Sequence, residues 1–259
     1  MSLDADAAAA ALHRTRRKRG ILHSLPPALA PATESEGAAV QYALARRLDA
    51  LPPAGFKIGA TARTMQEYLG LAGPAAGFMP GASLRPDGTS VPYASFLNPG
   101  VECELAVRLG RDLPPGSCTA AQAEAAVADL FAAIEIVEQR YGDLRVLGTP
   151  TLIADQVFHA AAVLGPPAPG WRELDLTALP GRILVDGTER FSGRGGDLLG
   201  HPMQALAWLA GSSVVAAFGG LRAGQVVMLG SVTPPVWLPG SAVVQVEFPP
   251  LPPVHLRLA

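Results

Sequence analysis

This sequence of 259 residues has few cysteines and almost no excess of charge of either sign. Its two cysteines, Cys103 and Cys118, are too few for a disulfide framework or a cysteine-rich metal site, and we expect free thiols in a reducing cytosol. Twenty basic and 22 acidic residues leave a net charge of −2. That balance offers no electrostatic footprint for a nucleic acid or an anionic membrane. We therefore expect no nucleic-acid partner.

Membrane and export segments are lacking as well. No stretch reaches the roughly 18 apolar residues that a membrane span needs. The first 20 residues carry acids and alanines before the basic residues, which is the reverse of a secretory signal. Prolines interrupt the stretch after Arg16-Arg17, where a twin-arginine export signal would continue. We predict a cytoplasmic protein with no membrane partner.

Lysine is almost absent, because only Lys18 and Lys57 among the 20 basic residues are lysine. Arginine therefore supplies nearly all of the positive charge, and a lysine inside the apolar stretch 55–61 is unusual for this chain. One interpretation is that Lys57 occupies a site where arginine would not serve, since only lysine can lose its proton near neutral pH. The other is an edge-strand lysine whose stem is packed and whose ammonium lies in water. Composition alone does not separate the two.

The character of the sequence changes near residue 54. Residues 2–13 and 34–50 are alanine-rich with apolar residues at helical spacing, which predicts two helices in an N-terminal helical segment, 1–54. From residue 55 onward, short apolar and β-branched stretches alternate with glycine and proline. This pattern predicts a β domain over 55–259. The expected fold class is α+β, mixed and strand-dominated.

Individual elements of the second part follow from the same patterns. Strands are expected at 56–61, 101–110, 132–140, 226–232, 241–248 and 254–259, and a hairpin at 182–196 around Asp186-Gly187. Helices are expected at 62–71, 119–131 and 201–219, whereas 152–165 fits either a helix or a strand.

Three acidic residues stand in apolar strand sequence. Glu102 and Glu104 are two residues apart, so a strand places both carboxylates on one face. Glu135 lies in the equally apolar stretch 132–140. Three carboxylates from two strands would form the oxygen cage that Mg²⁺, Mn²⁺ or Ca²⁺ prefers. The alternative is that these acids lie on an edge strand and face water. Glu138 competes as third ligand, but its offset of three from Glu135 places it on the other face.

Six motifs in this order and spacing resemble one known family. They are FKIGAT (56–61), VECELAVRLGRDLP (101–114), IEIVEQR (134–140), IAD (153–155), SGRGGDLLGHPMQALAWLA (192–210) and LGSVTPPV (229–236). Together they resemble the fumarylacetoacetate hydrolase superfamily, in its branch of 2-oxopent-4-enoate hydratases and 4-oxalocrotonate decarboxylases. The resemblance runs from about residue 35 to 259 and implies a compact mixed β fold.

The resemblance also implies roles for particular residues. A divalent metal, Mg²⁺ or Mn²⁺, would be held by Glu102, Glu104 and Glu135. Lys57 and Asp155 would be catalytic, with Lys57 carrying a proton, although Asp155 fits a structural cap equally well. Ser231 and Thr233 would contact the substrate carboxylate or a metal-bound water. In the SGRGGDLLGHP motif, Arg194 carries no assigned role, and His201 is expected to begin the following helix.

Two places depart from the family pattern. Pro80 stands where hydratases commonly have an acid, and proline cannot do the acid–base work of an aspartate. Phe158 and His159 stand where relatives have a small residue or serine, and Phe158 indicates a narrower or more apolar pocket. The first departure weakens the hydratase assignment specifically and leaves the metal site intact.

The sequence therefore predicts a divalent-metal-dependent lyase, a hydratase or decarboxylase, acting on a short 2-oxo or 2-hydroxydienoate acid from a catabolic pathway. Two alternatives stay open: a metal-dependent hydrolase that cleaves a carbon–carbon bond in an acylpyruvate, and a non-catalytic metal-binding relative. We also expect a homo-oligomer, with the apolar segments 234–240 and 254–259 as candidates for the subunit contact.

Overall fold

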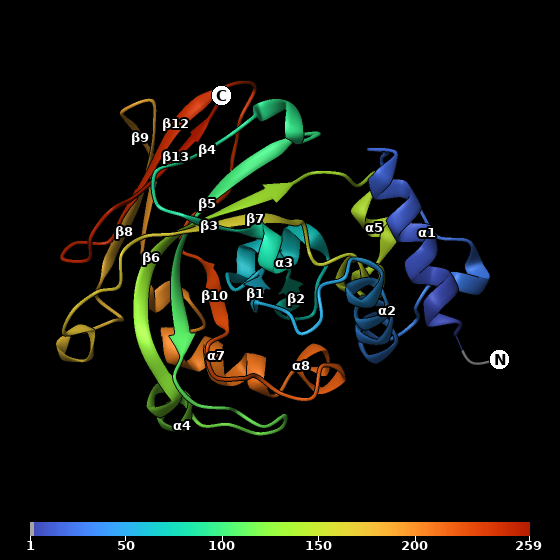
Figure 1. Cartoon of the computed structure of the whole chain (residues 1–259), viewed down its shortest axis with the longest axis horizontal. Helices are drawn as coiled ribbons and strands as arrows, with labels where there is room; N and C mark the ends of the chain where they lie inside the picture. The colour runs from blue at the N-terminus through green and yellow to red at the C-terminus, as the bar shows by residue number, and fades with distance from the viewer. Residues whose placement is uncertain (1–2) are drawn as a thin grey trace.

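The computed structural model describes residues 3–259, except for the side chains of Thr64, Tyr68 and Leu69. In that range the chain forms a larger and a smaller β-sheet that lie beside a group of helices (Figure 1). The larger sheet contains β1 (Gly55–Gly59), β2 (Ala75–Met79), β3 (Leu84–Pro86), β5 (Pro99–Leu109), β6 (Val127–Glu138), β7 (His159–Leu164), β10 (Val226–Ser231) and β11 (Val236–Trp237). The smaller sheet contains β4 (Thr89–Val91), β8 (Pro180–Val185), β9 (Thr188–Arg194), β12 (Ala242–Glu247) and β13 (Val254–Leu258).

The α-helices are α1 (Ala5–Arg17), α2 (Glu34–Arg47), α3 (Arg63–Leu69), α4 (Ala120–Ala126), α5 (Leu144–Leu147), α6 (Thr149–Ala154), α7 (Pro202–Ala210) and α8 (Ser213–Ala217). Short 3₁₀ helices cover Pro27–Leu29, Gly81–Ser83, Tyr93–Ser95, Trp171–Glu173 and Gly195–Asp197. None of the helices in residues 3–259 has the length and apolar character that crossing a bilayer requires. The α+β, strand-dominated fold class is confirmed.

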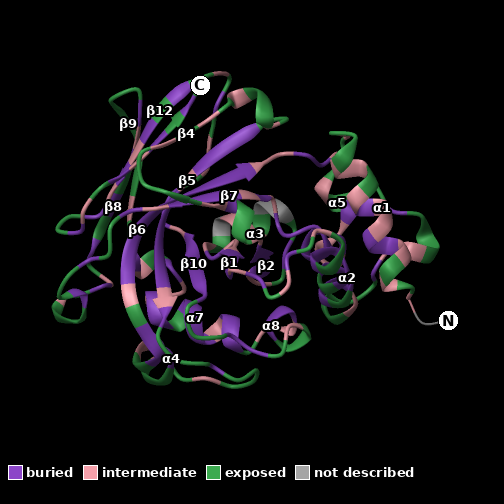
Figure 2. Cartoon of the chain, in the orientation of Figure 1, coloured by how far each residue is buried: buried purple, intermediate pink, exposed green. Residues whose placement is uncertain are grey.

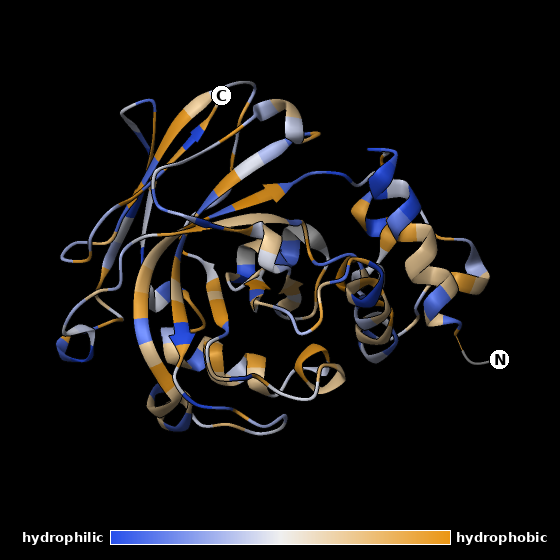
Figure 3. Cartoon of the chain, viewed as in Figure 1, coloured by the Kyte–Doolittle hydropathy of each residue, from blue (hydrophilic) through white to orange (hydrophobic). Residues whose placement is uncertain are grey.

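The larger sheet has the strand order β2-β1-β10-β5-β6-β7-β3, and β11 pairs with the free part of β5. β5 and β6, of 11 and 12 residues, run antiparallel along almost their whole length at the centre of this sheet. The smaller sheet, β4-β13-β12-β8-β9, packs against them through β8, β12 and β13. Figures 2 and 3 show that the central strands are largely buried and apolar. Alternate residues of β5 and β6 belong to two separate buried apolar clusters, so both faces of these strands are buried and a polar side chain on either strand is conspicuous.

The two expected N-terminal helices are present as α1 and α2. Thr33 caps α2 in a reciprocal capping box with Glu36, which explains where this helix begins. α1 packs on α2, and α2 packs on α6 and α8 (Figure 1). Through these contacts the N-terminal helices reach the segment that follows α6, which borders the site described below.

Two expected helices are shorter than the sequence pattern indicates. The helix expected at 119–131 ends at Ala126, because residues from Val127 onward pair with β5 and extend β6. Strand pairing here overrides the helical propensity of an alanine-rich stretch. The helix expected at 201–219 is two helices, since α7 ends before Gly211 and the Ser212 side chain caps α8. The ambiguous stretch 152–165 contains both types of element, the end of α6 and then β7.

In the C-terminal half, the expected hairpin and the expected position of His201 at the start of a helix are confirmed, whereas one candidate for the subunit contact is not available. Asp186 and Gly187 have φ of 51° and 75° and connect β8 to β9 in a two-residue hairpin. His201 is the N-cap of α7 and accepts a hydrogen bond from the Met203 backbone N–H. The apolar side chains of segment 254–259 are buried inside this chain, in β13, so they are not available for a subunit contact.

Candidate metal centre and active site

The register of β5 and β6 brings the three predicted carboxylates together. Glu102 lies directly opposite Glu135, and Glu104 lies two residues further along β5 on the same face. One carboxylate oxygen from each lies within 4.8 Å of the others. Glu138 points elsewhere, because its Oε1 accepts the Leu97 backbone N–H. The predicted face of the strand and the choice of Glu135 over Glu138 agree with this geometry.

Two buried oxygen atoms of this cluster make no hydrogen bond within the described residues, although Glu104 and Glu135 are fully buried. Glu104 Oε1 has no partner, and Glu135 Oε2 has only an ion pair with the Lys57 ammonium at 3.2 Å. Burying an unsatisfied carboxylate is costly unless a cation compensates it. Three carboxylates and the neighbouring Lys57 carry an excess of two negative charges when all are ionised. A divalent cation fits both the charge and the unsatisfied oxygens, and an all-oxygen set suits a hard cation.

Without a cation, ionisation of all three carboxylates of the cluster is unfavourable. Burial, followed by the charge of Glu135, raises the pKa of Glu102 to about 8, although Glu102 keeps partial exposure at a cavity wall. Burial and the same neighbouring charges also raise the pKa of Glu104. Burial opposes ionisation of Glu135 too, but Lys57 and His159 outweigh it and lower the pKa of that carboxyl. Binding of a cation would therefore displace protons from Glu102 and Glu104.

Gly230 explains how β10 accommodates the cluster. The pairing of β10 with β5 shifts register between Met228 and Ser231, and Gly230 between them has φ of 106°. Its backbone N–H donates to Glu104 Oε2 at 3.0 Å. A Cβ atom at this position would lie 2.4 Å from Thr61 Cγ2. Glycine is required here both for the backbone conformation and for the close approach.

Lys57, on β1, projects into the same cluster. Its Nζ lies 3.2 Å from Glu135 Oε2 and donates a hydrogen bond to the Val157 carbonyl oxygen at 2.9 Å. Only 2% of Lys57 is exposed, so the interpretation that its ammonium lies in water is wrong. Burial lowers the pKa of Lys57, but Glu135, Glu102 and Glu104 outweigh that effect and raise it. The lysine is thus a buried cation whose charge depends on these three carboxylates.

His159 also belongs to the cluster, and the sequence did not single it out as functional. At the start of β7, its Nδ1 lies 2.9 Å from Glu135 Oε1, and its Nε2 lies 2.9 Å from Ser83 Oγ. Burial lowers the pKa of His159 more than Glu135 raises it. A neutral imidazole that donates its Nδ1–H to Glu135 satisfies this geometry. The available signal was a polar residue at the head of an apolar strand.

Asp155 does not join the three glutamates. Its carboxylate accepts hydrogen bonds from Arg16 Nε at 2.6 Å, Arg140 Nε at 2.9 Å and the Tyr141 hydroxyl at 2.9 Å. Burial would raise the pKa of Asp155, but the two guanidinium groups outweigh it and lower the pKa. Asp155 is therefore an ionised, fully bonded group in the layer behind the cluster.

Two adjoining cavities open beside Glu102. One, of about 280 Å³, is lined by Lys57 and by apolar side chains that include Val157, Phe158 and Trp237. Phe158 therefore contributes an apolar wall, as expected from the sequence. Pro80 is not among the residues that line either cavity.

The second cavity, of about 420 Å³, is lined by the predicted substrate contacts Ser231 and Thr233, together with Glu102. Ser231 Oγ lies 2.7 Å from the Thr233 carbonyl oxygen, which fixes its rotamer at the cavity wall. Five of the seven predicted site residues lie together. Glu102, Glu104 and Glu135 form the carboxylate cluster, Lys57 forms an ion pair with Glu135, and Ser231 pairs with Glu104 across β10 and β5. Asp155 and Thr233 lie outside this group. Thr233 follows β10 and reaches the same cavity through the turn.

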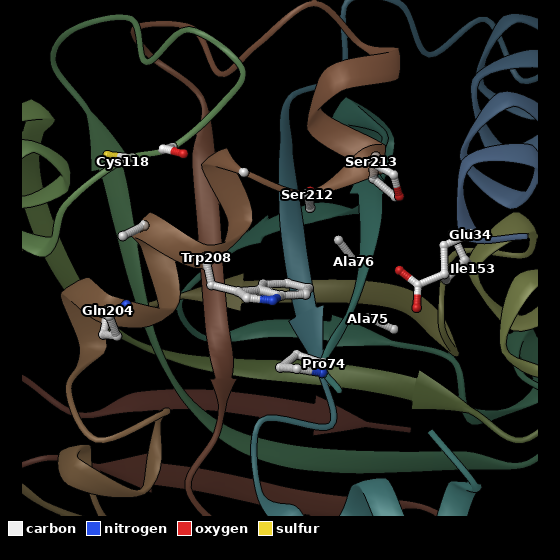
Figure 4. Close-up of a pocket in the computed structure, with 14 residues that line it drawn as sticks. Glu34, Pro74, Ala75, Ala76, Cys118, Ile153, Gln204, Trp208, Ser212 and Ser213 are labelled. Carbon is white, nitrogen blue, oxygen red and sulfur yellow. The ribbon is translucent and has the colours of Figure 1, made fainter. Parts of the chain in front are cut away.

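A separate groove of about 460 Å³ lies between α7, α8 and β2 (Figure 4). Trp208 projects from α7 toward Ala75 and Ala76, and Glu34 lies on the opposite wall (Figure 4). None of the three clustered glutamates lines this groove. It offers an aromatic wall without a convergent set of titratable groups, so we place the chemistry in the cavities beside Glu102.

Comparison with known proteins identifies relatives of this chain. Residues 57–258 match the family profile described as fumarylacetoacetate (FAA) hydrolase C-terminal. The chain is 38% identical over 182 residues to a 2-keto-4-pentenoate hydratase of Burkholderia vietnamiensis, an alignment that covers 70% of this chain and 69% of that protein. It is 32% identical over 183 residues to a 2-hydroxyhexa-2,4-dienoate hydratase of Comamonas testosteroni, with 70% and 68% covered.

A solved structure shares the whole fold. The 4-oxalocrotonate decarboxylase from Pseudomonas putida G7, complexed with magnesium and adipate, superposes with a TM-score of 0.88 at 24% sequence identity. The match covers 98% of this chain and 97% of that one. At this identity the likeness establishes the fold, and the N-terminal helices are part of it because the match is almost complete.

Proposed function

Because the chain belongs to the fumarylacetoacetate hydrolase family, and to its divalent-metal-dependent lyases of short 2-oxo and 2-hydroxydienoate acids, we propose that its own reaction is the hydration of such an acid. The observation that carries this proposal is the buried cluster of Glu102, Glu104 and Glu135 with Lys57 against it. Two curated relatives named above as hydratases support hydration over decarboxylation.

Glu102, Glu104 and Glu135 would hold the cation, and Mg²⁺ or Mn²⁺ is the ion that we propose. The unsatisfied oxygens of Glu104 and Glu135 support this assignment. When bound, a divalent cation supplies Lewis acidity that stabilises negative charge on the 2-oxo group of a chelating substrate. Gly230 and His159 would orient the ligands, because each donates to one oxygen of a carboxylate and leaves the other oxygen of that carboxylate to face the ion.

Lys57 would carry the proton. It is the titratable cation that lines the cavity beside Glu102, and its ammonium is held between Glu135 and the Val157 carbonyl. A proton carrier must lie within hydrogen-bond reach of the reacting carbon or oxygen, and Lys57 lines this cavity beside Glu102, which we assign as a metal ligand. Ser231 and Thr233 would bind the substrate carboxylate from the adjoining cavity.

The apolar wall formed by Val137, Phe158 and Trp237 would receive the hydrocarbon end of the acid.

Residues 55–259 would form the metal-binding catalytic part of the chain, with 1–54 as a helical segment that supports it. We also propose that the protein works in the cytoplasm as a homo-oligomer. Trp237 supports the oligomer, because 43% of this aromatic residue is exposed in the single chain.

An ultraviolet assay with 2-hydroxypenta-2,4-dienoate, with and without Mg²⁺ or Mn²⁺, tests the proposal. We expect metal-dependent loss of the dienoate absorbance with formation of a hydrated product. Loss of carbon dioxide from 4-oxalocrotonate with no hydration would assign decarboxylation instead. Cleavage of an acylpyruvate would assign the hydrolase alternative, and Mg²⁺ binding with no turnover of the whole panel would assign a non-catalytic relative.

A further inference from the structure

Three consecutive residues beside the metal centre have a left-handed backbone. Gln156, Val157 and Phe158 have φ of 62°, 49° and 65°. This conformation is unfavourable for residues other than glycine, because Cβ crowds the following carbonyl oxygen, and it is rarest for a β-branched residue such as Val157. A run of three persists only where the surrounding structure holds it. We call residues 156–158 the left-handed turn.

The left-handed turn contributes a hydrogen-bond acceptor and two apolar side chains to the active site. The Val157 carbonyl oxygen accepts the hydrogen bond from Lys57 Nζ at 2.9 Å, which fixes the direction of the buried ammonium. The side chains of Val157 and Phe158 line the apolar cavity. Val157 also packs closely on β1, since a Cβ atom at Gly59 would lie 2.8 Å from Val157 Cγ1. The orientation of Lys57 therefore depends on the backbone of this turn.

Two arginines hold the residue that precedes the turn. Arg16 binds Asp155 twice, with Nε 2.6 Å from Oδ1 and Nη2 2.7 Å from the carbonyl oxygen. Arg140 does the same from the other side, with Nε 2.9 Å from Oδ2 and Nη2 3.0 Å from the carbonyl oxygen. We call Asp155, Arg16 and Arg140 the Asp155 clamp. Both fork-shaped guanidinium groups thus fix the side chain and the backbone of one residue together.

The clamp also reaches into the turn and beyond it. Arg16 donates through Nη1 to the Gln156 side-chain oxygen, and Gln156 Nε2 donates to the Phe78 carbonyl oxygen at 2.8 Å. Arg140 Nη1 donates to the carbonyl oxygen of His159 at 3.3 Å. The turn is consequently held at its start, along its first side chain and at its exit. Arg16 makes its contribution from α1, 139 residues away in the sequence.

We propose that Arg16 is a positioning residue for the active site, which acts through Asp155 and the left-handed turn on the orientation of Lys57. Asp155 has the same kind of role, because its oxygens are occupied by three donors and it lies outside both cavities. The effect on turnover rests on the proposed function, whereas the effect on Lys57 does not. The first helix is then part of the catalytic apparatus without touching substrate.

The near absence of lysine allows a direct test on the full-length protein. Growth with lysine labelled with ¹³C at Cε gives two side-chain signals, from Lys18 and Lys57, and the Lys57→Arg variant identifies the second. We expect Arg16→Gln to shift or broaden the Lys57 signal without any substrate present. The matched control is Arg17→Gln, which removes the same charge from the next residue. Arg17 is exposed, and in the described part of the chain it makes no hydrogen bond to Asp155 or the turn.

Kinetics supply the second measurement. We expect Arg16→Gln to lower kcat for hydration about 10- to 100-fold, the size expected when a reacting group is misplaced by about 1 Å. The calorimetric Mg²⁺ affinity should stay at the wild-type value because the three glutamates remain, and KM should change less than kcat because only Val157 and Phe158 of the cavity wall belong to the turn. If Arg16→Gln does not fold, the Arg16→Lys variant is used for both measurements. It keeps the charge but cannot reach Asp155 and Gln156 together, so it should show a smaller shift and a smaller loss of kcat.

The outcomes separate this inference from the proposed function. An unchanged Lys57 signal in a folded Arg16 variant overturns the inference even if the wild-type protein hydrates its substrate. An equal shift in Arg17→Gln also overturns it, because charge alone would then explain the effect. A shifted Lys57 signal in Arg16→Gln but not in Arg17→Gln supports it even if the wild-type protein hydrates none of the acids tested, a result that removes only the proposed hydration.

Discussion

Glu102 and Glu135 face each other directly across the β5–β6 pair, the first partly exposed at the cavity wall and the second fully buried. Like charges at such a pair destabilise a sheet, and Glu104 adds a third acid on the same face. Lys57 offsets one charge through its 3.2 Å ion pair with Glu135. A divalent cation would relieve the repulsion that remains among the three carboxylates. The cluster therefore lowers the stability of the metal-free protein and raises its affinity for the ion.

Replacing Glu104 by glutamine should expose this trade. The substitution removes a charge and a ligand but keeps the shape of the side chain, so we expect Mg²⁺ affinity to fall by at least about tenfold. The metal-free variant should unfold at the same or a higher temperature, because a buried repulsion is removed. Calorimetric titration and thermal unfolding measure the two effects. Mg²⁺ affinity equal to wild type in this variant would show that Glu104 is not a ligand.

The pH dependence of the metal-free protein follows from Glu102. Its pKa is raised to about 8 in the folded chain from an ordinary value of 4.5. Between these values the folded state keeps a proton that the unfolded state releases, so the contribution of Glu102 to the free energy of unfolding decreases as pH rises from about 5 to about 8. Urea unfolding of EDTA-treated protein over this range should therefore show a steeper decline for wild type than for Glu102→Gln.

The same shift governs metal binding. Below pH 8 a cation must displace the Glu102 proton, so Mg²⁺ affinity should rise from pH 6 to pH 8, with proton release detectable from the buffer dependence of the calorimetric heat. Equal heats in buffers of different ionisation enthalpy at pH 7 would contradict this.

Strand periodicity, which is local, predicted that Glu102 and Glu104 share a face, and the family resemblance then favoured a metal cluster with Glu135 over acids that face water. Two acids two residues apart share a face whatever the fold, and Glu135 stood out by its apolar neighbours. The Asp155 clamp could not be predicted from the sequence, because it depends on contacts between residues far apart in the chain. Arg16 and Asp155 are brought together by the packing of α1 and α6 around α2, and no spacing in the sequence reports a contact of that kind. The overlong helix expected at 119–131 failed on the same ground, since pairing with β5 decided where the helix ends.

His159 gives a prediction that sequence patterns did not suggest. Its Nδ1–H donates to Glu135 Oε1, and Ser83 fixes the other side of the ring. His159→Phe should keep the ring volume but leave Glu135 without this donor, and second-layer partners of metal ligands are typically worth about 10- to 100-fold in affinity. We expect that loss for Mg²⁺ by calorimetry. His159→Asn retains a donor and should bind Mg²⁺ more tightly than His159→Phe. Equal affinities in both variants would mean that the hydrogen bond does not orient Glu135.

Lys57 supports the most discriminating prediction, because the chain uses arginine everywhere else except Lys18. Lys57→Arg keeps the positive charge beside Glu135 but cannot release a proton at working pH. We expect the variant to fold and to bind Mg²⁺, and to lose about 10²- to 10⁴-fold in turnover, the contribution typical of a general acid or base. Lys18→Arg, an exposed replacement on the end of α1, is the matched control and should retain full activity. If Lys57 only pairs with the substrate carboxylate, arginine should serve in its place and the defect should appear mainly in KM. Turnover above about a tenth of wild type would lie outside the acid–base range and would decide against a proton-carrying role.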